Sequence, residues 1–350
     1  MTSTSRHVRV GTLVTLYLLA AMVARAAQRD ANDDHEREGR YCSQTASALA
    51  QACGYERQDA YWLAVAKCIN LEDDNERAAC YLDAAVERRD KATVCRAQFV
   101  GRQAACERLG QDRFDPDLDA NDFERDYANP GAINRYFPLR IGARWTFAGP
   151  TEVATLEILN RTKLVDGVTC VVVRDSVFRN GDLSEDTEDW YAQAKNGDVW
   201  YCGEEVKDYD TFDGDRPRKP ELVKIDGSFK AGRNGDKAGV IFKAAPKAGD
   251  AYREEFSLGN AEDVSEVLST TYTFGKSADL DRFVPAALAK LFCDGDCVVT
   301  KNYNLLEPGV SARKYYAPGV GFFLETKQDA ISVQLVSCTL DSRCASLPKP

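Results

Sequence analysis

The chain has 350 residues and a formal net charge of −10. This acidic balance argues against nucleic acid or an anionic membrane surface as the main partner. The two histidines, His7 and His35, both precede the part expected to fold. A Ser-His-Asp triad, a Cys-His pair and a His-ligated zinc site are therefore excluded there, and we expect no cofactor and no metal.

Residues 1–27 have the pattern of a secretory signal peptide. Arg6 and Arg9 precede an apolar run from Val10 to Val23, and Ala24-Arg25-Ala26 supplies the small-x-small pattern that signal peptidase accepts. The run of 14 residues is shorter than the roughly 20 that a membrane helix needs. We therefore expect a secreted or periplasmic protein with no membrane insertion after cleavage, and an uncleaved anchor is the alternative.

Twelve cysteines follow the predicted signal peptide, six at positions 42–106 and six at positions 170–344. In an exported chain an even count of this kind is most simply explained by disulfides. Because each half holds an even number, we expect each half to close its own bridges. Residues 28–40 are rich in charge and are predicted to form a disordered lead-in.

Residues 41–110 are predicted to form a series of short helical hairpins joined by disulfides. Cys42, Cys68 and Cys95 are spaced by 26 and 27 residues, and an alanine precedes each of the other three cysteines. That period fits two short helices and a turn, and the polar stretch 70–74 contains good N-cap residues. The favoured bridges are Cys42–Cys53, Cys68–Cys80 and Cys95–Cys106, with bridges between neighbouring repeats as the alternative.

This cysteine-rich part resembles secreted bacterial repeat modules of the form C…R..CY..A…C. The residues that carry the resemblance are Cys68, Arg77, Cys80, Tyr81, Ala84 and Cys95. Such modules imply no particular chemistry. A short helical array is expected to act as a spacer or as a protein-binding surface.

Residues 111–133 are predicted to be an acidic linker between the two halves. Asp115, Asp117 and Asp119 alternate, and Asp126 stands at the twelfth place, which is the spacing of a calcium-binding loop. However, Ala120 stands where such loops carry the glycine of a sharp turn. A solvated acidic linker is therefore the favoured interpretation.

Residues 134–345 have the period-two pattern of β-strands, with aromatic and β-branched side chains. Asp166-Gly167 and Asn180-Gly181 are hairpin signals. We predict strands at 168–179, 183–194, 199–206, 251–258, 265–274, 297–306, 312–316, 321–328 and 330–338, and one helix at Asp279–Leu291. The expected fold class is α+β: a small disulfide-stapled helical repeat domain followed by a larger antiparallel β-meander that forms a curved sheet or half-open barrel.

The six cysteines of this β part are predicted to be structural. Cys338 and Cys344 are near enough in sequence to close a C-terminal loop. Cys170 and Cys297 each begin an apolar strand, and a disulfide between them could bridge these strands if they are neighbours. The pairings that follow from this reading are Cys170–Cys297, Cys202–Cys293 and Cys338–Cys344.

Several segments of the β part resemble an uncharacterised family of exported bacterial β-rich proteins. They are YFPL at 136–139, DGVTCVV at 166–172, DWYAQ at 189–193, GDVWY at 197–201, LEPGV at 306–310 and KYYAPGVGF at 314–322. The resemblance spans most of the β part and implies no activity and no catalytic residues. It therefore leaves the chemistry to the residues themselves.

Without histidine, carboxylates are the most available catalysts, and one predicted strand concentrates them. The candidate catalytic residues are Glu185, Asp186, Glu188 and Asp189, and the candidate ligand-binding aromatics are Trp190, Tyr191 and Trp200. Strand alternation places Glu185 and Asp189 on the face of Tyr191, and Asp186 and Glu188 on the other. Paired carboxyls beside aromatic rings are typical of glycosidases, although many solvated strand faces share both ingredients.

Three functions are compatible with these observations. The leading one is an exported non-enzymatic binding or structural protein whose partner is an unknown protein or small molecule. The second is a carrier of an apolar ligand inside a curved sheet, with a cavity expected beneath the predicted helix at 279–291. The third is a carboxylate-dependent hydrolase, which requires two buried carboxyls with raised proton affinity.

Overall fold

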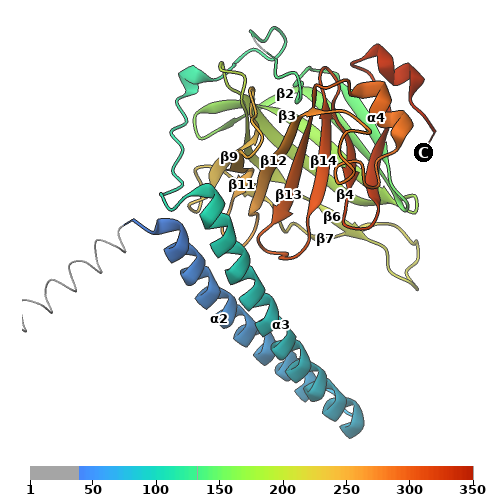
Figure 1. Cartoon of the computed structure of the whole chain (residues 1–350). Helices are drawn as coiled ribbons and strands as arrows, with labels where there is room; N and C mark the ends of the chain where they lie inside the picture. The colour runs from blue at the N-terminus through green and yellow to red at the C-terminus, as the bar shows by residue number, and fades with distance from the viewer. Residues whose placement is uncertain (1–38, 132, 350) are drawn as a thin grey trace, which may run out of the picture.

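The computed structural model describes residues 39–131 and 133–349. The predicted signal peptide and nearly all of the predicted lead-in lie outside the described residues. The described chain forms a two-helix arm followed by one antiparallel sheet that curves into a nearly closed barrel (Figure 1). This arrangement confirms the predicted α+β fold, with a disulfide-linked helical part followed by a curved antiparallel sheet.

The arm consists of two continuous helices, α2 (Tyr41–Ile69) and α3 (Asp74–Leu109). The expected series of short hairpins is wrong, because no proline interrupts either helix and the chain turns at the polar stretch around Asp73. The Asp73 carboxylate caps α3 by accepting hydrogen bonds from the backbone N–H groups of Asn75 (2.8 Å) and Glu76 (2.9 Å). Among the described helices, none is both long and apolar enough to cross a membrane.

Three disulfides join the two helices in a ladder: Cys42–Cys106, Cys53–Cys95 and Cys68–Cys80. The predicted bridge Cys68–Cys80 is confirmed. The predicted bridges Cys42–Cys53 and Cys95–Cys106 are wrong, because each pair lies on one straight helix. Eleven residues of helix span about 16 Å, far beyond the reach of a disulfide.

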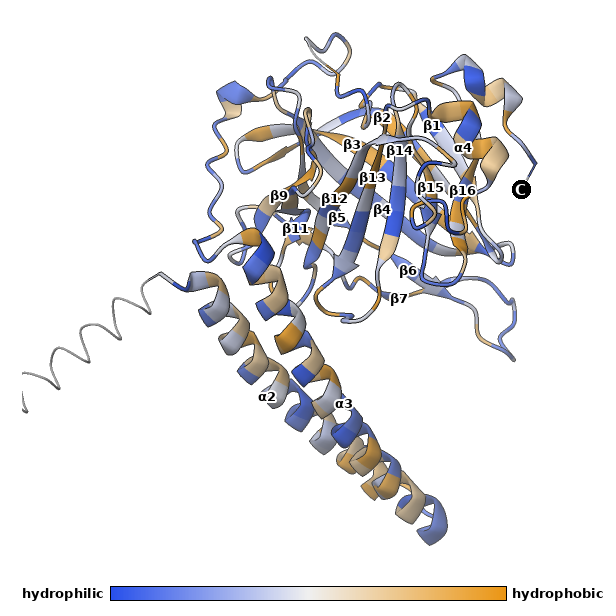
Figure 2. Cartoon of the chain, in the orientation of Figure 1, coloured by the Kyte–Doolittle hydropathy of each residue, from blue (hydrophilic) through white to orange (hydrophobic). Residues whose placement is uncertain are grey.

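The ladder compensates for a thin interface between the helices. Few side chains in the arm are buried, and Figure 2 shows hydrophilic and hydrophobic residues mixed along both helices. The buried ones are Cys42, Ala46 and Cys68 on α2 and Ala84, Arg102, Ala105 and Cys106 on α3. Cross-links therefore supply stability that such a small apolar contact cannot provide alone.

The barrel is one sheet whose strands follow the order β10-β12-β13-β14-β15-β16-β1-β2-β3-β4-β5-β9-β11. Their bounds are β1 (Arg144–Ala148), β2 (Glu152–Val165), β3 (Val168–Arg179), β4 (Asp182–Gln193), β5 (Val199–Glu205), β9 (Lys237–Phe242), β10 (Ala251–Arg253), β11 (Glu255–Phe256), β12 (Asp263–Tyr272), β13 (Cys297–Asn304), β14 (Ala312–Ala317), β15 (Gly321–Thr326) and β16 (Ile331–Cys338). Three short strands lie off this path: β6 (Asp208–Asp210), β7 (Glu221–Lys224) and β8 (Phe229–Lys230).

The predicted hairpin turns at the two ends of β3 are confirmed. Asp166 and Gly167 have φ values of 48° and 80°, and Asn180 and Gly181 have values of 52° and 89°. Two consecutive left-handed residues match the twist of antiparallel strands. Asp-Gly and Asn-Gly adopt this conformation readily, which explains why one pair occurs at each of the two turns. Strand β3 has the predicted bounds as a result.

One short segment closes the barrel. The predicted strand 251–258 is divided at Glu254, with β10 pairing with β12 and β11 pairing with β9, so the segment joins the two edges of the sheet. Gly239 permits this crossing, because a Cβ atom there would lie 2.2 Å from the carbonyl oxygen of Glu254. The absence of a side chain at position 239 is therefore a condition of closure.

Helix α4 (Ala286–Phe292) covers the outside of the sheet and is shorter than the predicted helix at 279–291. Pro285 stands at its N-cap, and the preceding Phe283 has a φ of 63°, so the helix cannot extend toward residue 279. Leu288, Ala289 and Phe292 are buried against the sheet, and the Phe292 ring packs on Phe323 at 5.2 Å between centroids. Side chains thus fill the space beneath α4.

The disulfides of the barrel are Cys170–Cys202, Cys293–Cys297 and Cys338–Cys344. The last of these confirms a prediction, and the predicted Cys170–Cys297 and Cys202–Cys293 are wrong. Strands β3 and β13 lie six places apart in the sheet order, so their cysteines cannot meet. Cys293 instead ends α4 and meets Cys297 across a turn in which Gly295 has a φ of 81°.

Part of the predicted acidic linker packs on the barrel. Phe123 is 5% exposed and Tyr127 is 3% exposed. The Glu124 backbone N–H donates to the Gln193 carbonyl oxygen at 2.8 Å, and a short helical turn, η1 (Ala120–Asp122), precedes this contact. A second turn, η2 (Ser342–Ser346), follows the last strand.

Candidate ligand site in the barrel interior

Strand β4 divides the predicted site residues between two faces. Glu185 and Asp189 face the barrel interior together with Tyr191, as strand alternation requires. Asp186 and Glu188 face outward, where Asp186 accepts hydrogen bonds from Arg174 (2.7 and 3.0 Å) and Glu188 pairs with Arg161. The outward pair is thus engaged with arginines on the surface of the sheet.

The two predicted ligand-binding tryptophans also lie on the outer face. Trp190 is buried in a small cluster with the Cys170–Cys202 disulfide, and the Lys163 ammonium lies 3.4 Å from the centroid of its ring. Trp200 belongs to the same cluster and packs against Phe123 at 6.3 Å. Both rings pack with Phe123 of the predicted linker, and Tyr191 is the predicted aromatic that faces the interior.

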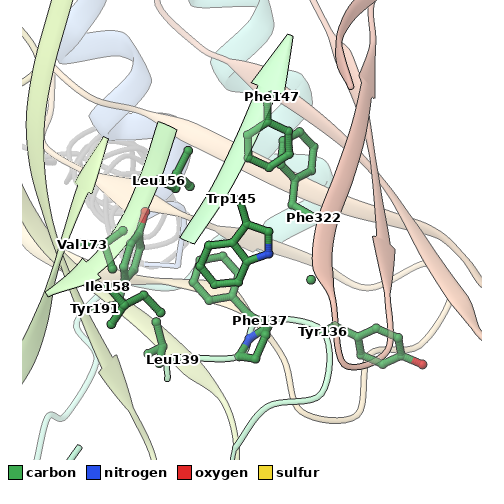
Figure 3. Close-up of a pocket in the computed structure, with 12 residues that line it drawn as sticks. Tyr136, Phe137, Leu139, Trp145, Phe147, Leu156, Ile158, Val173, Tyr191 and Phe322 are labelled. Carbon is green, nitrogen blue, oxygen red and sulfur yellow. The ribbon is translucent and has the colours of Figure 1, made fainter. Parts of the chain in front are cut away.

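One end of the interior is apolar. Figure 3 shows Trp145 there, surrounded by aromatic and aliphatic side chains from several strands and from the segment that precedes β1. The Trp145 indole N–H donates to the carbonyl oxygen of Val320 at 2.8 Å, and Phe147 packs on Phe322 at 4.9 Å. These side chains leave a cavity of about 50 Å³, which Tyr191 also lines. That volume has room for only a few carbon atoms.

The other end of the interior is acidic. Its carboxyls come from strands β3, β4, β5, β12 and β15 and from the closing segment, and Lys314 on β14 is a basic side chain among them. The carboxyls are Asp175, Glu185, Asp189, Glu204, Glu254, Glu255, Asp263 and Glu325. Most of these residues keep part of their surface exposed, so water reaches the acidic end of the interior.

Asp189 and Glu204 form a carboxyl pair within this cluster. They are direct cross-strand partners in the β4–β5 ladder. The Tyr201 hydroxyl donates a hydrogen bond to Asp189 Oδ1, and its ring stacks on Tyr191 with centroids 4.7 Å apart. Burial raises the pKa of both carboxyls, and the neighbouring Asp189 charge raises that of Glu204 further.

Glu254, in the closing segment, is held by a polar chain from β13. Asn302 donates to Glu254 Oε1 at 2.7 Å, and Thr300 donates to Asn302 Oδ1 at 2.6 Å. Burial raises the pKa of Glu254 to about 7, although the Lys314 ammonium opposes this shift. Burial disfavours the charge on Lys314, but Tyr316 and the carboxyls around it outweigh this and raise its pKa.

Two buried hydroxyls beside Glu254 make no hydrogen bond of normal geometry within the described protein, although Ser265 lies near both the Tyr252 hydroxyl and Glu254. Tyr252 is 6% exposed and Ser265 is 1% exposed, and they are cross-strand partners of β10 and β12. The Tyr252 hydroxyl and Ser265 Oγ make no hydrogen bond of normal geometry, and Asp175 Oδ1 and Asp263 Oδ1 share this property. Buried polar atoms are almost always satisfied, so this concentration is typical of a functional site.

Of the acidic cluster, only Glu185 and Asp189 were predicted as site residues from the sequence. The remaining members are spread from position 175 to position 325 and are assembled only by the barrel. Among the described residues, no group of three or more His, Cys, Asp or Glu side chains has an arrangement that could hold a metal ion, and this includes the calcium-like spacing at 115–126.

A larger hollow of about 540 Å³ lies outside the barrel, at the base of the arm. Most of its charged side chains already have partners: Lys237 pairs with Asp115, Arg113 lies over the Tyr41 ring at 3.9 Å, and Arg253 lies over Phe256 at 5.3 Å. The interior of the barrel therefore remains the stronger candidate.

Comparison of the chain with protein-family models, with curated proteins and with solved structures finds no match. The resemblance of the β part to exported bacterial proteins, and of the arm to cysteine-rich repeat modules, thus stays a prediction. The function has to be inferred from the side chains that line the barrel.

Proposed function

We propose that this chain is an exported binding protein that takes a small molecule into the acidic end of its barrel. The observation that carries the proposal is the polarised interior, in which an acidic, water-accessible end adjoins a small apolar cavity through Tyr191. Concave sites with a few convergent polar groups on an apolar wall are the usual form of small-molecule sites.

Export is supported by the covalent chemistry of the chain. All twelve cysteines are paired, and disulfides in this number form and persist in oxidising compartments outside the cytoplasm. Together with the predicted signal peptide, this favours a secreted or periplasmic location.

The arm is proposed to present the barrel at a distance from an attachment point or partner. Its helices are about 40 and 50 Å long at 1.5 Å per residue, and three disulfides stiffen them. Trp62, Leu63 and Leu82 are exposed toward its far end, where a partner protein could bind.

A carboxylate-dependent hydrolase is the second candidate. It is favoured by the Asp189–Glu204 pair, because two adjacent carboxyls with raised pKa values and a shared tyrosine can divide the roles of acid and base. A carrier of a large apolar ligand receives less support, because side chains fill the space beneath α4 and the apolar cavity measures about 50 Å³.

Native mass spectrometry and thermal shift test the binding proposal. The mature chain, purified from its exported fraction, is expected to retain a small molecule or to gain thermal stability with members of a metabolite set. Glu204→Gln should abolish that effect, whereas Glu188→Gln, on the outer face of the adjacent strand, should preserve it. Turnover of a ligand, lost in Glu204→Gln, would favour the hydrolase, and an equal response of both variants would refute the interior site.

A further inference from the structure

We propose that the ligand is a small organic cation: an amine whose ammonium group lies among Asp189, Glu204 and Glu254 and whose short apolar portion enters the cavity beside Trp145. This inference rests on the proposed function and names the chemical class of the ligand. It is carried by the charge of the cluster, by two unpartnered hydroxyls, and by the position of the apolar cavity.

The many carboxyls of the cluster favour a cation as the ligand. Carboxyls from most of the barrel wall meet at one end of the interior, and the one ammonium group named among them, that of Lys314, is already surrounded by Glu254, Asp263 and Glu325. Like charges at short range in a partly desolvated site repel one another strongly, so several of these carboxyls retain protons near neutral pH. A bound ammonium group allows them to ionise and then attracts them, whereas a neutral ligand brings no such gain and an anion opposes ionisation.

The unpartnered hydroxyls provide an independent observation. Tyr252 and Ser265 are buried beside Glu254, and neither oxygen makes a hydrogen bond of normal geometry within the described protein, although Ser265 lies near both the Tyr252 hydroxyl and Glu254. An ammonium group carries three N–H donors and no acceptor, so it can donate to a carboxylate and to hydroxyl oxygens together. A buried oxygen without a well-formed hydrogen bond is costly, and a ligand of this chemistry would supply the missing donors.

The tyrosines of the wall favour an organic cation. Tyr191 and Tyr201 are stacked with an interplanar angle of 20°, and the Tyr201 hydroxyl contacts Asp189. Aromatic faces attract ammonium groups and the methylene groups beside them. Because Tyr191 lines both the acidic end and the cavity at Trp145, an alkyl chain of a few carbons would reach from one to the other.

Isothermal titration of the full mature chain at pH 7.5 and low salt tests the inference with 1-pentylamine and its neutral isostere 1-pentanol. The amine is expected to bind at least about tenfold more tightly, and added salt should weaken it. Binding should also release protons, visible as a dependence of the heat on the buffer, because a cation lowers the pKa of the carboxyls around it.

Two interior variants and two surface controls define the site. Glu204→Gln and Asp189→Asn should each weaken pentylamine binding by about tenfold or more. Asp186→Asn and Glu188→Gln remove charges from the outer face of the same strand and should leave the affinity unchanged. Circular dichroism confirms folding, and Glu254→Gln provides a third interior variant should Asp189→Asn fold poorly.

The failures of the two proposals are distinguishable. Equal binding of pentanol and pentylamine, still lost in Glu204→Gln, would overturn the cation while the interior site survives. Binding of Ca²⁺ that displaces the amine and depends on Glu204 would replace the organic cation with a metal ion. Pentylamine binding unaffected by all three interior variants would overturn both the ligand class and the site.

Discussion

Arg102 on α3 and Glu262, the residue that precedes β12, form a buried ion pair that joins the arm to the barrel. Arg102 Nε donates to Glu262 Oε2 and its Nη2 donates to Oε1, each at 2.8 Å, with side-chain exposures of 5% and 1%. The Gly259 backbone N–H also donates to Oε1 at 2.7 Å. This planar two-bond contact fixes the direction in which the arm leaves the barrel.

Loss of this arginine should release the arm. Arg102→Ala leaves the Glu262 carboxylate buried without a cation, which typically costs about 3–5 kcal/mol. Urea denaturation should show a lower midpoint, and limited proteolysis should cut faster in residues 110–122. The double variant Arg102→Met with Glu262→Leu should recover most of the stability, and Arg89→Ala, on the exposed part of α3, should have no effect.

The disulfide ladder should control the arm and leave the barrel intact. Replacing Cys53 and Cys95 by serine opens a loop of 42 residues, worth about 4 kcal/mol in the chain-entropy model. Helical circular dichroism should melt at a lower temperature while near-ultraviolet signals of the barrel persist. Peptide mapping without reduction should recover Cys53 linked to Cys95, and recovery of Cys42 linked to Cys53 would contradict the ladder.

Stability should fall as the pH rises from about 4 through neutrality. Burial raises the pKa values of Asp189, Glu204 and Glu254 in the folded state, the last to about 7, whereas in the unfolded chain they titrate near 4. The folded state therefore binds more protons between these limits, and the free energy of unfolding decreases as the pH rises through that window.

Glu204→Gln should flatten this pH dependence. At pH 8 the variant should be more stable than the wild type by about 1–2 kcal/mol, because it removes one of two opposed carboxylates and each pKa unit is worth about 1.4 kcal/mol. The measurement is urea denaturation at pH 5 and pH 8. A wild-type protein that gains stability over this range would contradict the proposed protonation of the cluster.

Closure of the barrel should depend on Gly239. In Gly239→Ala the new methyl group would meet the carbonyl oxygen of Glu254 at 2.2 Å, so β9 or the closing segment must move. We expect a loss of at least about 2–3 kcal/mol by urea denaturation. Gly54→Ala, in α2 with open space around it, should instead stabilise the arm by up to about 1 kcal/mol.

Local features were readable from the sequence because short-range chemistry sets them. Asp166-Gly167 and Asn180-Gly181 favour left-handed conformations through their local chemistry, and they bound β3. The spacing of the arm cysteines is also consistent with the observed disulfide pairing. Cys53 to Cys68 and Cys80 to Cys95 are both 15 residues apart, and the outer pairs are both 11 apart, which is the symmetry of an antiparallel hairpin and not of a repeat.

The acidic site depended on the tertiary structure. Alternation along β4 separated Asp189 from Asp186, but it could not show that Glu204 lies opposite Asp189 or that Glu254 marks the closing segment. The disulfide partners of Cys170 and Cys293 also could not be predicted from alternation along a strand. Strand order and register are set by the packing of many distant side chains, whereas turns, caps and alternation depend on neighbours along the chain. The sequence by itself thus determined the turns, the helix cap and strands such as β3 and β4, and only the barrel-shaped sheet decided which residues share its interior.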